Sequence, residues 1–132
     1  MVEEVWGVHH RKENARAFCH AVKAAEKAGR EYGIALAPQP DNPHDPNAIG
    51  VLGQCMVKLW FRAPQLREWH IGYVQRDLAK ELNNEFLSKD ITIASELYEI
   101  FEQGDFFEIK FIVLAPSGHS HSARMKRSAG NQ

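Results

Sequence analysis

The sequence has no excess of charge and no long apolar run. Its 132 residues carry 16 Lys and Arg against 17 Asp and Glu. No global field would therefore draw the protein to nucleic acid or to an anionic membrane, and a nucleic-acid site would have to be a local patch. No apolar stretch approaches the roughly 18 residues of a membrane helix, and the opening MVEEVWGVHH lacks the features of a secretory signal. We expect a soluble protein with no membrane partner.

Cysteines and catalytic motifs are equally scarce. Cys19 and Cys55 form no CxxC pair, so reduced thiols and a cytoplasmic location are the simplest expectation. The chain has no GxSxG, Walker or GxGxxG motif. Cys19 is not a credible nucleophile with the adjacent His20, because neighbouring side chains on a helix diverge. We predict a noncatalytic protein.

Histidines are present, but their spacing does not match known metal motifs. Adjacent His9 and His10 would point to opposite faces of a strand, and no HxxxH pair accompanies His44 or His70. We therefore predict no metal site and no cofactor.

The apolar pattern predicts one domain, residues 1–116, followed by a flexible Ser- and His-rich tail, residues 117–132. A helix is expected from an N-cap at Asn14 to Gly29, because apolar residues recur there at helical spacing. A first strand would bend at Gly7, where we expect a close backbone approach. Other expected elements are strands at 32–38, 47–53, 56–61 and 71–74, a polar excursion at 62–69, a helix around 78–86, and a final hairpin of strands 91–101 and 106–115 that turns at Gln103–Asp105.

Six or seven short strands and two helices do not alternate as βαβ units would. The fold class we predict is mainly β with short helices: a small OB-like (SH3/OB-type) antiparallel barrel with two helices.

The loop DNPHDPNAIGV, residues 41–51, combines turn residues with potential ligand-binding groups. Pro43 and Pro46 fix φ, and Asn and Asp side chains bond readily to nearby amides, so the loop should be rigid. A rigid polar loop could hold a ligand, or its polar groups could only satisfy one another. Both interpretations remain open on these residues alone.

Tyr73 and Arg76 lie in IGYVQRDLA, where a strand leads into a helix. An aromatic ring at a strand end and an Arg in a first helical turn could stack on a base and contact a phosphate. The alternatives are a half-buried core tyrosine and a solvated helix start.

Three stretches together, VWGVHH, NPHDPNAIGV and IGYVQRDLAKEL, resemble the HIRAN domain, whose pattern has a VxG strand, an NPxDxNAI loop and a GxxxxxxA turn and helix in this order. The resemblance spans roughly residues 4–114 and is most specific in the central loop. It implies an OB-like barrel in a standalone HIRAN-domain protein. It also implies capture of the 3′-hydroxyl end of single-stranded DNA, as in DNA repair.

The resemblance further implies roles for particular residues. Asp45 would accept the terminal hydroxyl with support from Asn42, His10 and His44 would stack on a base, and Arg76 would contact phosphate. His9 and Tyr73 would line the path of the backbone and Phe106 would form the pocket floor. The predicted nucleic-acid-binding residues are thus His9, His10, Asn42, His44, Asp45, Tyr73, Arg76 and Phe106.

This chain departs from the DNA-capturing relative at positions 9, 10 and 44, where histidine replaces a basic residue or tyrosine. Binding would then be weaker, and stronger below pH 7 where histidine gains charge. Residues 54–69 are longer than the family's usual connection and could alter access. Two alternatives follow: a protein-interaction or regulatory module that has lost DNA binding, or a metal-dependent phosphoesterase using His and Asp of the central loop. The expected partners are single-stranded DNA 3′ ends and a larger DNA-processing protein.

Overall fold

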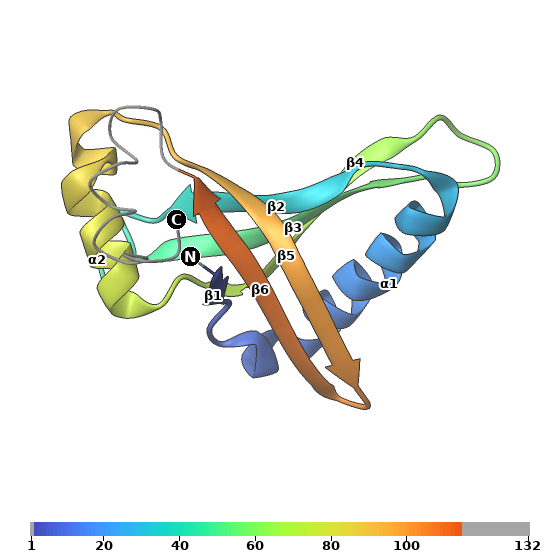
Figure 1. The fold of residues 1–132 in the computed structure, drawn as a ribbon, viewed down its shortest axis with the longest axis horizontal. Helices are drawn as coiled ribbons and strands as arrows, with labels where there is room; N and C mark the ends of the chain where they lie inside the picture. The colour runs from blue at the N-terminus through green and yellow to red at the C-terminus, as the bar shows by residue number, and fades with distance from the viewer. Residues whose placement is uncertain (1, 115–132) are drawn as a thin grey trace.

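The protein folds as two antiparallel sheets with two helices in the computed structural model, which describes residues 2–114 (Figure 1). Three elements precede the first long hairpin: strand β1 (Val2–Glu4), the 3₁₀ helix η1 (Val8–Arg11) and helix α1 (Lys12–Ala28). The remaining elements are β2 (Tyr32–Pro38), β3 (Ile49–Val57), β4 (Gln65–Tyr73), α2 (Arg76–Glu85), the 3₁₀ helix η2 (Leu87–Lys89), β5 (Ala94–Gln103) and β6 (Phe106–Leu114).

The two sheets each contain three strands, in the orders β1-β6-β5 and β2-β3-β4. All their ladders are antiparallel. The β5–β6 hairpin crosses the β2–β3 pair in Figure 1, and α1 and α2 lie at opposite ends of the molecule. The register of β3 and β4 shifts where Val51 pairs with Gly72 and Leu52 pairs with His70, so Ile71 is the extra residue of a bulge.

Two open seams separate the sheets. At the β1–β4 seam, Trp6, which follows β1, forms an isolated antiparallel bridge with Tyr73 at the end of β4. At the β2–β5 seam, the Ser95 hydroxyl donates a hydrogen bond to the carbonyl oxygen of Ile34 at 2.9 Å. The ladders of residues 2–114 do not continue across either seam, so the mainly β fold is confirmed and the closed OB-like barrel stays a prediction.

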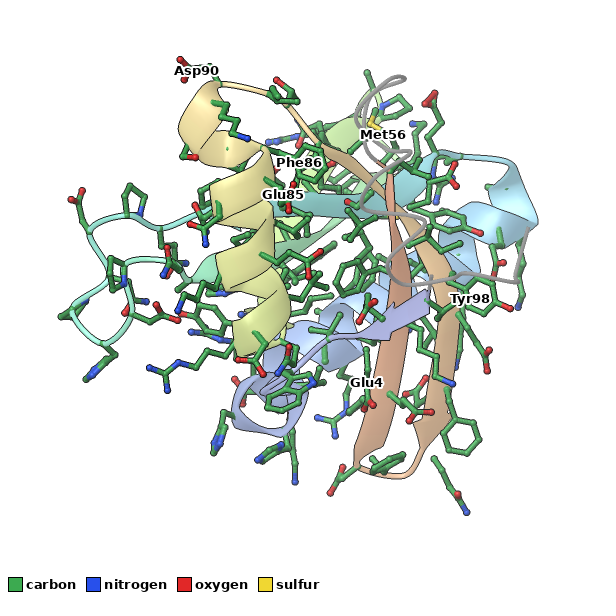
Figure 2. The ribbon with its side chains drawn as sticks, turned by 60° about the vertical axis from the view of Figure 1, so that its left-hand side comes forward. Glu4, Met56, Glu85, Phe86, Asp90 and Tyr98 are labelled. Atoms are coloured by element: carbon green, nitrogen blue, oxygen red, sulfur yellow. The ribbon has the colours of Figure 1, made fainter. Side chains whose placement is uncertain are left out.

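The core lies between the sheets and the helices. Helix α1 packs against β3 and β4, and Phe18 and Cys19 are fully buried there. At the end of α2, Phe86 is also buried. Tyr98 on β5 lies on the side of the molecule opposite α2, at the right of Figure 2. The largest fully buried side chains are Phe18, Phe86, Phe111, Ile49, Ile71, Leu82, Ile109, Val51, Cys19 and Cys55.

The N-terminal strand is shorter than predicted, because the chain turns at Gly7. Gly7 has a φ of 78° and precedes η1, so Val8–Arg11 are helical rather than extended. The predicted close approach at Gly7 is wrong, since a Cβ there would meet nothing within 4 Å. Glycine is favoured at position 7 because the backbone there is left-handed.

The predicted helix exists, but Asn14 does not cap it. The helix begins at Lys12, and the Asn14 side-chain amide donates to the carbonyl oxygen of His70 at 3.0 Å. Gly29 ends the helix as expected. A capping residue reads the same in sequence as a polar residue that ties a helix to a sheet, so only the tertiary contact distinguishes the two.

The segment 54–69 forms a hairpin, not a strand followed by a polar excursion. β3 runs on to Val57, residues 58–64 turn, and Gln65–Tyr73 pair back as β4. The final hairpin is confirmed, with Gly104 and Asp105 between β5 and β6. The predicted tail, 117–132, and the domain boundary at 116 lie outside the described residues.

Candidate nucleic-acid interface

The loop between β2 and β3 is held by hydrogen bonds within itself. Asn42 Oδ1 accepts from the backbone amides of His44 at 2.8 Å and Asp45 at 3.1 Å, and its Nδ2 donates to Gln39 Oε1 at 2.9 Å. Asp45 Oδ1 accepts from the Asn47 amide at 2.9 Å. The loop is therefore the rigid turn that its Pro and Asx residues predict. Asn42 is fully engaged in building it.

The β1–β4 seam stands opposite this loop. Trp6 and Tyr73 exchange two backbone hydrogen bonds of 2.8 Å, which fixes both residues in register. Gly72 makes this approach possible, because a Cβ at that position would lie 2.4 Å from the Trp6 carbonyl oxygen. The Trp6 side chain remains 54% exposed. A large aromatic surface is thus presented to solvent on a fixed backbone.

A cavity of about 440 Å³ lies between the loop and the seam. It brings together five of the eight predicted site residues, although they are separated by up to 34 positions in the chain. Its lining consists of Trp6, Gly7, Asn42, His44, Asp45, Ala48, Tyr73, Val74 and Arg76. The surface is mostly apolar with a few polar groups, which is typical of small-ligand sites.

Two opposite charges face each other at this cavity. Asp45 Oδ2 lies 3.9 Å from Arg76 Nε, too far for a hydrogen bond. Arg76 is the first residue of α2, its side chain is 79% exposed, and the helix start is capped by Gln75 rather than by Arg76. A carboxylate oxygen can accept a hydrogen bond from a hydroxyl while the neighbouring guanidinium binds a phosphate.

The Tyr73 ring contacts the side chains of His70 and Arg11. The His70 ring packs edge-on against it at 4.9 Å between centroids, and the Arg11 guanidinium carbon lies 5.6 Å from the ring centroid. His70 Nε2 is 2.8 Å from the Gly72 carbonyl oxygen. Burial, together with the charge of Arg11, lowers the pKa of His70 below its ordinary 6.5. The neutral imidazole is therefore favoured beside the Arg11 cation.

The other three predicted residues lie outside this cavity. His9 and Phe106 line a neighbouring cavity of about 640 Å³, which shares Trp6 and Gly7 with the first. Phe106 packs edge-on against Phe101 there, with ring centroids 6.0 Å apart.

His10 is not among the residues that line either cavity. The expectation that His9 and His10 point to opposite faces is wrong. Both lie on η1, where their exposed rings are 4.1 Å apart. A 3₁₀ helix turns successive side chains by far less than a strand does.

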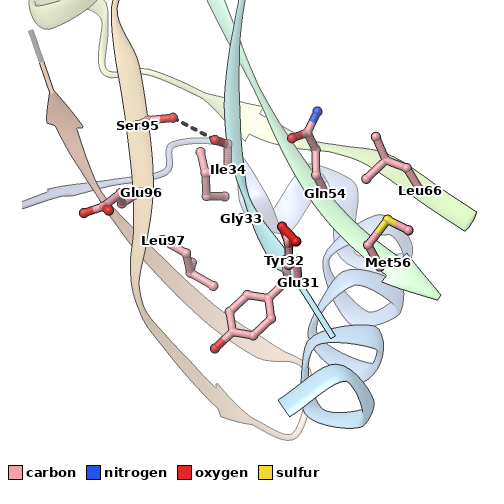
Figure 3. A pocket seen from close by; sticks show the side chains of 10 residues that line it. All are labelled: Glu31, Tyr32, Gly33, Ile34, Gln54, Met56, Leu66, Ser95, Glu96 and Leu97. Atoms are coloured by element: carbon pink, nitrogen blue, oxygen red, sulfur yellow. Dashed lines mark hydrogen bonds between the residues drawn. The ribbon is translucent and has the colours of Figure 1, made fainter. Parts of the chain in front are cut away.

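Another cavity, about 570 Å³ and so larger than the 440 Å³ cavity at Asp45, opens at the β2–β5 seam (Figure 3). Its lining includes the carboxylates of Glu31 and Glu96 and no Lys, Arg or His. An anionic ligand would be repelled there, so size alone does not identify the nucleic-acid site.

Cys19 and the histidines offer little for catalysis or metal binding. Burial, and next the charge of Glu102, raises the pKa of Cys19 to about 11, which favours the protonated thiol over the nucleophilic thiolate. Within residues 2–114, no three His, Cys, Asp or Glu side chains lie together as metal ligands would.

Sequence reasoning missed Trp6 and Arg11 as site residues. Trp6 reads as an ordinary strand aromatic, and Arg11 as part of the basic run His9–Lys12. Their proximity to Tyr73 depends on the Trp6–Tyr73 bridge and the turn at Gly7, which leave no local signal. The nearest hint is the concentration of cationic and imidazole groups directly after VWG.

Comparison with known proteins identifies the family of the chain but does not bear on individual site residues. No helix within residues 2–114 is long and apolar enough to cross a membrane. No curated protein and no solved structure gives a significant match. The family model of the HIRAN domain matches residues 4–112, which include the last residue of β1, the central loop, Gly72–Ala79 and all but the last two residues of the final hairpin. The chain therefore belongs to the HIRAN domain family, a family of single-stranded DNA-binding modules.

Proposed function

We propose that this protein is a noncatalytic module that binds the 3′-terminal nucleotide of single-stranded DNA in the 440 Å³ cavity and reads its free hydroxyl. The observation that carries this proposal is the meeting of Asp45, Arg76 and two exposed or half-buried aromatic side chains, Trp6 and Tyr73, around one cavity. The family supports nucleic-acid binding, and the cavity chemistry supports a terminal sugar.

Each group has a distinct role in this proposal. Asp45 Oδ2 accepts a hydrogen bond from the 3′-hydroxyl, while Asp45 Oδ1 accepts from the Asn47 amide. Asn42 holds the loop, since its amide is already engaged, and Arg76 contacts a backbone phosphate close to the terminal nucleotide. Trp6 and His44 present rings to the base, and base stacking on aromatics is worth about 1–3 kcal/mol. The free buried thiols suit the reducing cytoplasm that we propose as its compartment.

The test is fluorescence anisotropy with a labelled single strand that ends in a 3′-hydroxyl, beside the same strand with a 3′-phosphate. The hydroxyl strand should bind at least tenfold tighter, because a charge-assisted hydrogen bond contributes about 1.5–3 kcal/mol and the phosphate is repelled by Asp45. Equal affinity of the two strands for the native protein would overturn end recognition.

Asp45→Asn is the decisive variant. Its side-chain oxygen can still accept from the Asn47 amide, so the loop is kept while the carboxylate is lost. Discrimination between the two strands should disappear. Asp77→Asn, in the first turn of α2, is the matched control, because it removes one negative charge from an exposed side chain that does not line the cavity.

A further inference from the structure

The tip of the β3–β4 hairpin exposes three consecutive large apolar side chains. Leu59, Trp60 and Phe61, here called the aromatic tip, are 47%, 90% and 61% exposed. The hairpin extends past α1, away from α2 (Figure 1). An apolar cluster at a projecting point is typical of an interaction surface rather than of a core.

The aromatic tip is ordered by its own contacts. The Lys58 ammonium donates to the carbonyl oxygens of Leu59, at 3.1 Å, and Arg62. The Trp60 and Phe61 rings meet edge-on, 5.4 Å between centroids, and the Arg62 guanidinium lies over Phe61 at 5.4 Å. Because the turn is closed in this way, a ligand that stacks on Trp60 loses little of its binding energy to ordering the loop.

The charged residues in the stretch of chain that carries the tip are of one sign. Residues 55–67 contain Lys58, Arg62 and Arg67 and no Asp or Glu. The β5–β6 hairpin also exposes aromatic rings, Phe101 and Phe106, but its residues 94–108 contain five carboxylates and no Lys or Arg. Similar exposed rings thus occur in opposite electrostatic settings. The aromatic tip fits a partner that is both anionic and planar.

Single-stranded nucleic acid has this chemistry, since its bases stack on aromatic side chains and its phosphates bind Lys and Arg. We propose that the aromatic tip is a second contact for the strand whose 3′ end occupies the cavity, with one base on Trp60 and a phosphate at Arg62. This inference rests on the proposed function.

The geometry of β4 sets the length of strand that can reach both contacts. β4 runs from Gln65, beside the tip, to Tyr73, at the cavity. Eight residue steps at about 3.3 Å each give about 26 Å. A stacked strand advances about 3.4 Å per nucleotide, so about eight nucleotides separate the two contacts.

The experiment compares two single strands with free 3′-hydroxyls, one of about 4 and one of about 14 nucleotides, in anisotropy titrations at low salt. Trp60→Ala should weaken binding of the long strand by about fivefold or more and leave the short strand unchanged. Tyr98→Ala, an exposed aromatic on β5, is the matched control and should change neither. Circular dichroism melts verify that each variant is folded.

Three results would overturn the inference. If Trp60→Ala leaves the affinity for the long strand unchanged, the tip makes no second contact. If Trp60→Ala weakens binding of both strands equally, the effect lies at the cavity. Loss of binding to phosphatidylserine vesicles in Trp60→Ala, with long-strand binding intact, would identify a membrane surface as the partner instead.

Failure of the proposed function gives a different pattern. If long strands ending in a hydroxyl and in a phosphate bind equally, and Trp60→Ala weakens both, the tip contact stands and end recognition falls. If hydroxyl selectivity persists and Trp60→Ala has no effect, end recognition stands and the tip contact falls.

Discussion

The two seams between the sheets differ in how they are closed and in what they attract. The β1–β4 seam is joined by paired backbone hydrogen bonds of 2.8 Å and opens on a cavity with Arg76 and two large aromatic residues. The β2–β5 seam is crossed by the Ser95 hydroxyl and opens on a larger cavity with two carboxylates. Both seams lie where no continuous ladder joins the two small sheets. A cavity at a seam is therefore not by itself a binding site, and charge and aromatic side chains, rather than cavity size, distinguish the candidate DNA site.

The largest expected effect comes from breaking the β1–β4 seam. Gly72→Ala would drive a Cβ to within 2.4 Å of the Trp6 carbonyl oxygen. Overpacking of this kind costs typically about 1–3 kcal/mol of unfolding free energy. It should also displace Trp6 and weaken DNA binding. Urea denaturation and anisotropy measure the two effects.

The control lies at the other seam. Gly33 lines the β2–β5 cavity, and a Cβ there would meet nothing within 4 Å. Gly33→Ala should therefore leave both stability and DNA binding close to those of the native protein. Equal destabilisation by the two substitutions would mean that the Trp6–Tyr73 bridge is no more demanding than any other strand position.

A smaller effect is expected from the charges. Arg76→Gln should reduce the dependence of log Kd on log salt by about 0.7, the contribution of one phosphate contact on a single strand. Glu96→Gln, at the β2–β5 seam, changes the charge in the opposite direction and should leave this slope as it is. Anisotropy titrations at several salt concentrations give both slopes. Identical slopes for all three proteins would place the phosphate contact elsewhere.

The smallest effect is a pH dependence of stability at the β1–β4 seam. The pKa of His70 is lowered from 6.5 by burial and by Arg11, so the unfolded chain takes up this proton more readily than the folded protein. Stability due to neutral His70 is therefore complete above about pH 6.5 and is lost as pH falls through the lowered folded value.

His70→Gln removes that titration. Thermal melts between about pH 7.5 and 5 should show a shallower fall in Tm for this variant than for the native protein. His20→Asn, an exposed position on α1, controls for the loss of one imidazole. If Tm falls equally with pH in the native protein and in His70→Gln, His70 contributes nothing to the loss of stability in acid.

Local patterns predicted the elements whose cause is local. The apolar spacing from Ala17 to Ala28 predicted α1, and Gln103–Asp105 predicted the last turn, because helical periodicity and turn residues act over a few positions. The 3₁₀ helix η1 was missed, since β-forming Val5 and Val8 favour a strand until Gly7 turns the chain. The β3–β4 hairpin was missed because Pro64 and polar residues obscured the start of β4.

The candidate site divides in the same way. Asn42, His44 and Asp45 are adjacent in sequence and were predicted together, whereas Trp6 and Arg11 join them through the β1–β4 seam. Phe106 was expected in the same pocket, but the β5–β6 hairpin carries it to the neighbouring cavity.

The sequence by itself therefore determined the mainly β composition, the two helices, the rigid central loop and the resemblance to the HIRAN domain. Only the tertiary structure decided which residues share a cavity, because the Trp6–Tyr73 bridge links positions 67 residues apart and depends on the missing side chain of Gly72. It also decided that the β3–β4 hairpin presents Trp60 to solvent. Pairing between distant strands is fixed by shape and hydrogen bonding in the folded protein. Neither produces a local pattern that can be recognised in the sequence.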